Sequence, residues 1–191
     1  MSFIVQVSES ERAAGMLNRD TALAAYQALF DNGVLLLRGC FAPEVVEGLY
    51  ADFMARYGDS DLAQMQARAR LPPPSPVMQV GGSRFELAVP MRGRFGDPSF
   101  FANPVLLNFL WPLLGATMRL SGVTAVAAFP GAELQHIHRD YPHLYPDYPA
   151  LGTNLPIYAV NASVPLVDVD MTMGPTGFWP GSHRQTDDAP T

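Results

Sequence analysis

The side chains best suited to chemistry lie in the segment 135–140, which reads Gln-His-Ile-His-Arg-Asp. On a strand, alternate side chains share a face, so His136, His138 and Asp140 are expected to point the same way. An imidazole and a carboxylate two residues apart can converge on one ion, because their Cβ atoms lie roughly 7 Å apart and each metal–ligand bond spans about 2 Å. His138 and Asp140 therefore form the beginning of a two-histidine-one-carboxylate site, the donor set that holds non-haem iron(II).

A second pair of donors competes with this one, because His136 and His138 are also two residues apart. A His-x-His pair after a glycine is similar to the cupin motif, which expects a glutamate three or four residues after the second histidine. Tyr141 and Pro142 stand there instead, so we favour His138 and Asp140. His136 is then expected to line a pocket or to be a buried, hydrogen-bonded imidazole. Tyr141 opens an aromatic and proline-rich loop that is expected to line the same pocket.

The chain that must position these groups has 191 residues, which suggests one domain. Twelve Lys and Arg residues against eighteen Asp and Glu residues give a net charge of −6, which excludes the basic footprint of a nucleic-acid-binding protein. The single cysteine, Cys40, excludes an intramolecular disulfide and a cysteine-based zinc site. No signal-peptide pattern and no apolar run of membrane-spanning length is present, so we expect a cytoplasmic protein without a membrane partner.

The first half of the sequence is predicted to be mainly helical. Asp20 is expected to begin a helix that Gly33 ends, and Pro43 lies in the first turn of a later helix. The predicted helices are 20–30, 44–57, 62–69 and 104–114, and the predicted strands are 34–37 and 85–89. The proline-rich tract 72–83 is predicted to be a loop that acts as a lid.

The second half changes character, because short apolar and β-branched runs alternate with Pro- and Gly-rich turns. The predicted strands are 123–129, 133–138, 157–164 and 167–171. Helices followed by short antiparallel strands predict an α+β fold with a β-sandwich or barrel at its centre.

A second cluster, residues 174–184, reads Gly-Pro-Thr-Gly-Phe-Trp-Pro-Gly-Ser-His-Arg. Its glycines permit tight turns, and Pro180 with Gly181 fixes a corner that presents His183. In this order and with these gaps, the spans 33–57, 135–145 and 157–184 resemble the phytanoyl-CoA dioxygenase-like family of iron(II)/2-oxoglutarate oxygenases. The resemblance covers most of the chain.

The resemblance implies a double-stranded β-helix core, jelly-roll or cupin-like, with flanking N-terminal helices. Residues 1–191 would form one oxygenase domain, with 1–118 as its mainly helical part and 119–191 as the first half of the β-helix. By motif match, His138 and Asp140 would be iron ligands. The implied cofactors are Fe(II), the co-substrate 2-oxoglutarate and O₂. The implied reaction hydroxylates a small organic metabolite and releases succinate and CO₂.

The resemblance also implies roles for residues around the metal. Tyr158 and Asn161 are the polar side chains of a strand that borders the co-substrate pocket in the family, and are expected to bind the co-substrate. His183 is expected to be a structural or pocket residue, and Trp179 to pack beneath the corner. Arg84, beside the predicted lid, is expected to be a solvated surface arginine, with pairing to a carboxylate as the alternative.

The chain also departs from the family pattern. The family's distal histidine ligand follows the Pro-Gly-Ser-His corner, and the arginine or lysine that clamps 2-oxoglutarate lies beyond it, but only Arg184 and no histidine follows His183 here. We therefore expect a chain that is C-terminally truncated relative to the family and lacks the last strands. Three alternatives stay open: His183 as the third ligand, a non-catalytic β-helix domain that binds a small molecule, and a cupin-type metalloenzyme that uses His136 and His138.

Overall fold

A computed structural model describes residues 3–141, 144–145, 147–148, 151 and 155–185 of the chain. The chain folds as two compact units, which are described in turn. The first unit comprises Met1–Pro43, Ala102–Met118 and Ile137–Thr191. The second comprises Glu44–Phe101 and Arg119–His136. The first unit contains the candidate metal ligands His138 and Asp140.

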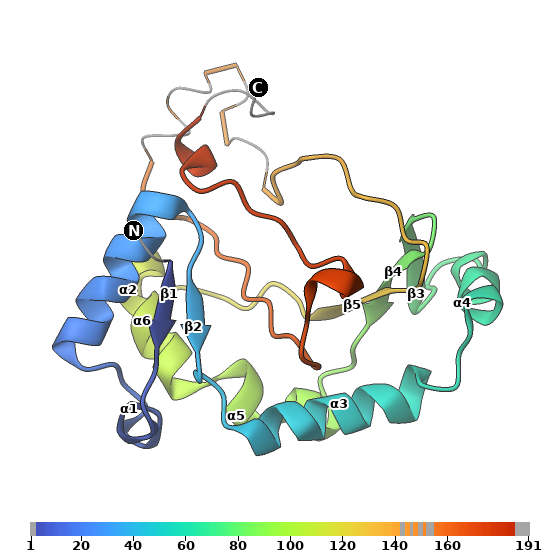
Figure 1. Cartoon of the computed structure of the whole chain (residues 1–191), viewed down its shortest axis with the longest axis horizontal. Helices are drawn as coiled ribbons and strands as arrows, with labels where there is room; N and C mark the ends of the chain where they lie inside the picture. The colour runs from blue at the N-terminus through green and yellow to red at the C-terminus, as the bar shows by residue number, and fades with distance from the viewer. Residues whose placement is uncertain (1–2, 142–143, 146, 149–150, 152–154, 186–191) are drawn as a thin grey trace. The chain divides into compact units, whose positions relative to one another are not determined.

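Two parallel strands and two helices form the amino-terminal part of the first unit, and a third helix, over residues 104–114, packs in the same core (Figure 1). Strand β1 pairs with β2 so that Ile4 lies opposite Leu36, and the parallel pairing requires the helical crossover between them. The elements of this unit are β1 (Ile4–Gln6), α1 (Glu9–Ala14), α2 (Arg19–Asn32), β2 (Leu36–Arg38), α6 (Pro104–Leu114), and the 3₁₀ turns η2 (Met171–Met173) and η3 (Ser182–Arg184).

The core of the first unit lies between α2 and α6. Tyr26 stacks on Phe109 with ring centroids 4.7 Å apart, and its hydroxyl donates to the Phe109 carbonyl oxygen. Asn103 caps α6, and its side chain also bonds the backbone of the buried Cys40. Burial raises the pKa of the Cys40 thiol to about 11, so this thiol stays protonated.

A buried carboxylate joins the starts of α1 and α2. Ser8 and Glu11 form a capping box at the start of α1. The Glu11 carboxylate accepts from the Ser8 hydroxyl at 2.6 Å, from the Ser8 backbone N–H at 2.8 Å and from the Asn18 backbone N–H at 2.9 Å. Asn18 is itself the N-cap of α2. The bonds from Ser8 and Asn18 lower the pKa of Glu11 to about 2.

Replacement of Glu11 by glutamine is expected to destabilise the protein by about 2 kcal/mol at pH 7, because hydrogen bonds to a charged acceptor are lost. Since the pKa is lower in the folded state than in the unfolded state, the contribution of the carboxylate is present above pH 4.5 and is lost as the pH falls towards 2. Urea unfolding at pH 7 and pH 3 measures both effects. The exposed Glu9, in the same first turn, provides the control Glu9→Gln. Equal unfolding midpoints for the two variants at pH 7 would contradict the prediction.

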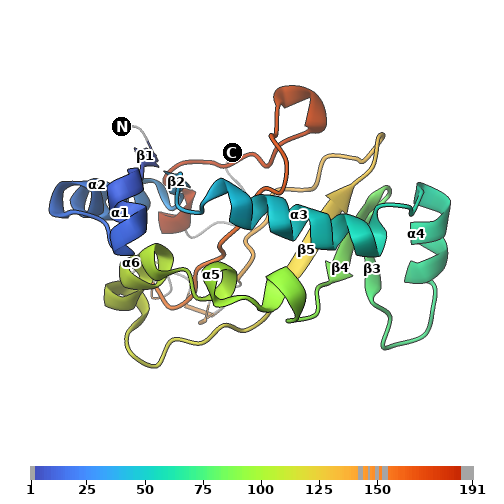
Figure 2. The same cartoon turned by 90° about the horizontal axis from the view of Figure 1, so that it is seen from below.

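The second unit is built on a three-stranded antiparallel sheet with the order β3-β4-β5 (Figure 2). Side chains of β4 alternate between its faces, and Phe85 and Leu87 are fully buried. Met65 of α4 packs in the same hydrophobic cluster. The elements of this unit are α3 (Pro43–Tyr57), α4 (Leu62–Ala69), β3 (Val77–Gly81), β4 (Arg84–Ala88), η1 (Gly93–Gly96), α5 (Pro98–Phe101) and β5 (Thr124–Ala128).

The mixture of helices and strands confirms the predicted α+β class. The predicted helices all form, although Asn18 rather than Asp20 caps α2 because its side chain reaches two backbone N–H groups. In the part of the chain that the structure describes, no helix is both long and apolar enough to cross a bilayer.

The strands are where prediction and structure differ. The tract 72–83 is not entirely a loop, because Val77–Gly81 pairs with β4. The strand predicted at 123–129 forms as β5, but the described residues of 133–138, 157–164 and 167–171 form no strand, and Met171 begins the 3₁₀ turn η2 (Figure 1). A strand exists only where its N–H and C=O groups find a second strand, and apolar alternation alone does not supply one. The sheets are small, so the double-stranded β-helix is not confirmed.

Candidate metal centre

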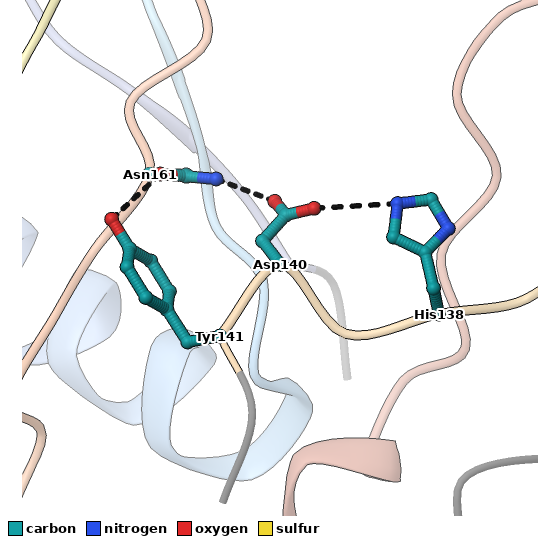
Figure 3. A network of polar contacts seen from close by, with 4 residues as sticks. All are labelled: His138, Asp140, Tyr141 and Asn161. Carbon is teal, nitrogen blue, oxygen red and sulfur yellow. Dashed lines mark hydrogen bonds and ion pairs between the residues drawn. The ribbon is translucent and has the colours of Figure 1, made fainter. Parts of the chain in front are cut away.

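The candidate ligands His138 and Asp140 face each other in the first unit (Figure 3). His138 Nε2 lies 3.5 Å from Asp140 Oδ1, and the two side chains are 41% and 57% exposed. The backbone here is irregular rather than a strand, but the two side chains still converge as the spacing predicts. Their exposure leaves both donors accessible to an ion from solvent.

Asn161 orients the carboxylate from its other side. The Asn161 amide Nδ2 donates to Asp140 Oδ2, and its Oδ1 accepts from the Tyr141 hydroxyl at 3.2 Å (Figure 3). The ring of Tyr141 meets the ring of Tyr158 edge-on, with centroids 6.4 Å apart. The bond from Asn161 engages Oδ2 and directs Oδ1 towards His138. The structure therefore brings together five residues that were predicted as site residues from the sequence. They are His138, Asp140, Tyr141, Tyr158 and Asn161, and they are joined by hydrogen bonds, an ion pair and a ring contact.

The donor pair fits two positions of a mononuclear iron site. Two ligands bound at right angles to one ion, with bonds of about 2.1 Å, lie about 3 Å apart, close to the observed separation of the two donor atoms. An imidazole nitrogen and a carboxylate oxygen are also the donor types of the two-histidine-one-carboxylate triad. Among the described residues, no group of three or more His, Cys, Asp and Glu side chains gathers around one point, so a third ligand is not assigned.

His183 lies at the end of α2. Its Nε2 is 3.1 Å from the Phe30 carbonyl oxygen. Burial lowers the pKa of His183, the nearby charges of Arg184 and Arg139 lower it further, and the Phe30 carbonyl opposes them. A neutral ring that donates from Nε2 carries its lone pair on Nδ1, which is buried and has no hydrogen-bond partner among the described residues.

The arginines near this site are bound to backbone carbonyls. Arg139 donates to the carbonyl oxygens of Ser182 and Gln185, and Arg184 donates to that of Phe30. Neither guanidinium is therefore assigned to a co-substrate carboxylate. From the sequence, Arg139 is named with Gln135 and Tyr141 only as a neighbour that could hydrogen-bond the His138 ring, and a residue between two candidate ligands carries no signal of a distant partner.

The other predicted site residues are placed as follows. Arg84 is in the second unit, half-buried, and donates to the Glu133 carbonyl oxygen rather than to a carboxylate. His136, expected in a pocket wall or buried, is exposed. Trp179, expected to pack beneath the corner, is 47% exposed. His143, which the sequence places in a loop and not among the ligands, lies outside the described residues.

The imidazole and the carboxylate that converge on this α+β scaffold are two of the three donors that hold iron in the two-histidine-one-carboxylate oxygenases. Residues 30–191 match the family model of phytanoyl-CoA dioxygenase (PhyH). The chain belongs to this family, as the resemblance of its motifs predicted. Membership supports an enzyme of the oxygenase type, in a family that generally depends on Fe(II) and 2-oxoglutarate.

Proposed function

We propose that this protein is an Fe(II)- and 2-oxoglutarate-dependent dioxygenase that hydroxylates a small organic metabolite and releases succinate and CO₂. The observation that carries the proposal is the His138–Asp140 pair, held by Asn161 within a chain of the PhyH family. We propose one oxygenase domain over residues 1–191, built on a double-stranded β-helix.

In this proposal His138 and Asp140 hold the iron, through Nε2 and Oδ1. Bound Fe(II), with 2-oxoglutarate and O₂, supplies the oxidising chemistry. Asn161 keeps Asp140 Oδ2 engaged, so the carboxylate presents a single oxygen in a fixed direction, as outer hydrogen bonds do for metal ligands elsewhere. Tyr141 fixes which end of the Asn161 amide faces the carboxylate. Tyr158 borders the co-substrate, beside the ring of Tyr141.

A second candidate function is a non-catalytic domain that binds a small molecule. It is favoured by the described residues, which offer two clustered donors rather than three. The two candidates differ in whether the protein binds iron with 2-oxoglutarate and turns the co-substrate over.

Anaerobic addition of Fe(II) and 2-oxoglutarate to the protein is expected to give a weak visible charge-transfer band, and admission of air is expected to produce succinate. The band requires the 2-oxo group to chelate bound iron, so glutarate in place of 2-oxoglutarate is the control and should give neither signal. Absence of both the band and succinate with 2-oxoglutarate would favour the non-catalytic domain.

A further inference from the structure

The turn Gly181–Gln185 is anchored on the carboxyl end of α2. The Gly181 N–H donates to the Asn32 carbonyl oxygen at 2.9 Å, and the side chains of His183 and Arg184 donate to that of Phe30. The last carbonyl groups of a helix have no partner inside the helix and favour positive charge. Helix α2 has no basic residue in its last turn, so Arg184 supplies that charge from a distant part of the sequence.

Gly33 allows this anchor to form. It follows α2 with φ of +72°, and its N–H donates to the Leu29 carbonyl oxygen. A Cβ atom placed here would overlap Nδ1 of His183 and lie 2.6 Å from its Cγ. The imidazole therefore packs directly on the Gly33 backbone, which no other residue type would permit.

The same turn holds the segment that carries the candidate ligands. Arg139 stands between His138 and Asp140, and its guanidinium donates to the carbonyl oxygens of Ser182 at 3.0 Å and of Gln185 at 2.6 Å. The segment 137–141 has no strand pairing to restrain it. The contacts of Arg139 with the turn therefore restrain the backbone between the two ligands.

We propose that His183 and Arg139 are positioning residues of the metal site: His183 fixes the Gly181–Gln185 turn on α2, and the turn fixes Arg139 and thereby the angle between His138 and Asp140. The proposal rests on the proposed function for the metal, but the anchoring of Arg139 can be measured without one. Neither residue would be a ligand of the ion in this proposal.

Trypsin cleavage after Arg139 reports the anchoring directly, because a bound guanidinium is protected from the protease. His183→Leu removes the hydrogen bond to the Phe30 carbonyl oxygen. Because loss of one hydrogen bond increases the population of the open form, the cleavage rate is expected to rise about fivefold to tenfold. His183→Gln places an amide N–H near the position of Nε2 and should stay within about twofold of the wild-type rate. Cleavage after Arg119, in the second unit, is the internal control. Equal rates for all three proteins would overturn the proposal.

Cobalt(II) binding, followed by its visible absorption, separates a positioning role from a ligand role. Loss of an outer-shell partner typically weakens metal binding about 10- to 100-fold, and this is expected for His183→Leu and for Arg139→Met. His183→Gln should retain the wild-type affinity.

If His183→Gln abolishes binding as completely as His138→Gln does, His183 is a ligand and the proposal is overturned. Unchanged affinity in His183→Leu with increased cleavage would also overturn it. If the wild-type protein binds no metal, the proposed function fails, and the proteolysis alone decides whether the turn holds Arg139.

Discussion

Asp140→Ala is expected to abolish both Fe(II) binding and succinate formation. The substitution removes one of two converging donors and leaves the Asn161 amide without its acceptor. Because removal of an outer-shell partner alone costs about 10- to 100-fold in metal affinity, loss of a direct ligand should exceed about 100-fold. Anaerobic iron titration and succinate assay of the variant measure the two effects. Retention of iron and activity in Asp140→Ala would refute the assignment.

Two further variants make this result specific. Asp168 is exposed and lies in the same carboxyl-terminal stretch, so Asp168→Ala changes the net charge equally and should leave iron binding unchanged. His136→Ala tests the cupin-type alternative, in which His136 and His138 bind the metal. That alternative expects loss of metal in His136→Ala and its retention in Asp140→Ala, the reverse of the result expected here.

The substitution Gly33→Ala is expected to lower the free energy of unfolding, and this is the second large effect that the structure predicts. An alanine in the left-handed region costs roughly 1–2 kcal/mol, and the added methyl group must also displace the ring of His183, with loss of about 1 kcal/mol from the hydrogen bond to Phe30. We expect a total destabilisation of about 2–3 kcal/mol, measured by urea unfolding.

The two contributions can be separated by matched variants. Gly174 has a similar left-handed backbone with φ of +67°, and open space surrounds its missing side chain, so Gly174→Ala should carry only the conformational cost of roughly 1–2 kcal/mol. In a His183→Ala background, Gly33→Ala should retain only its conformational cost. If Gly33→Ala costs the same with and without the His183 ring, the packing of the ring on the glycine is not the cause.

The four longer helices were predictable because their signals are local, whereas the short helices α1 and α5 were not predicted. Asp61 with Gln64 forms a capping box at the start of α4, and Asn103 and Gly115 bracket α6. The strands were less predictable, because each needs a partner from elsewhere in the chain. The run after the prolines forms β3 only because β4 lies beside it. The segment 157–164 has strand-like alternation and finds no such partner among the described residues.

In the candidate site too, the features set by neighbouring residues were predictable, and the contacts between distant residues were not. The spacing of His138 and Asp140 is local, and their convergence follows from it. The bond between Asn161 and Asp140 joins residues twenty-one positions apart, and a single sequence contains no sign of that pairing. The contacts of Arg139 with the Gly181–Gln185 turn join residues that are still further apart in the sequence. Only the folded chain therefore reveals that this turn holds the segment that carries His138 and Asp140.

The contact of His183 with Phe30 also bears on the order of folding, since it joins residues 153 positions apart. During synthesis the second unit has all its residues once the chain has passed His136, whereas the first waits for a late segment to return to an early helix. Contacts that close so long a loop tend to form slowly and after the local ones. We therefore expect the anchor on α2 to form in the last stage of folding, so that weakening it accelerates unfolding and leaves the folding rate nearly unchanged.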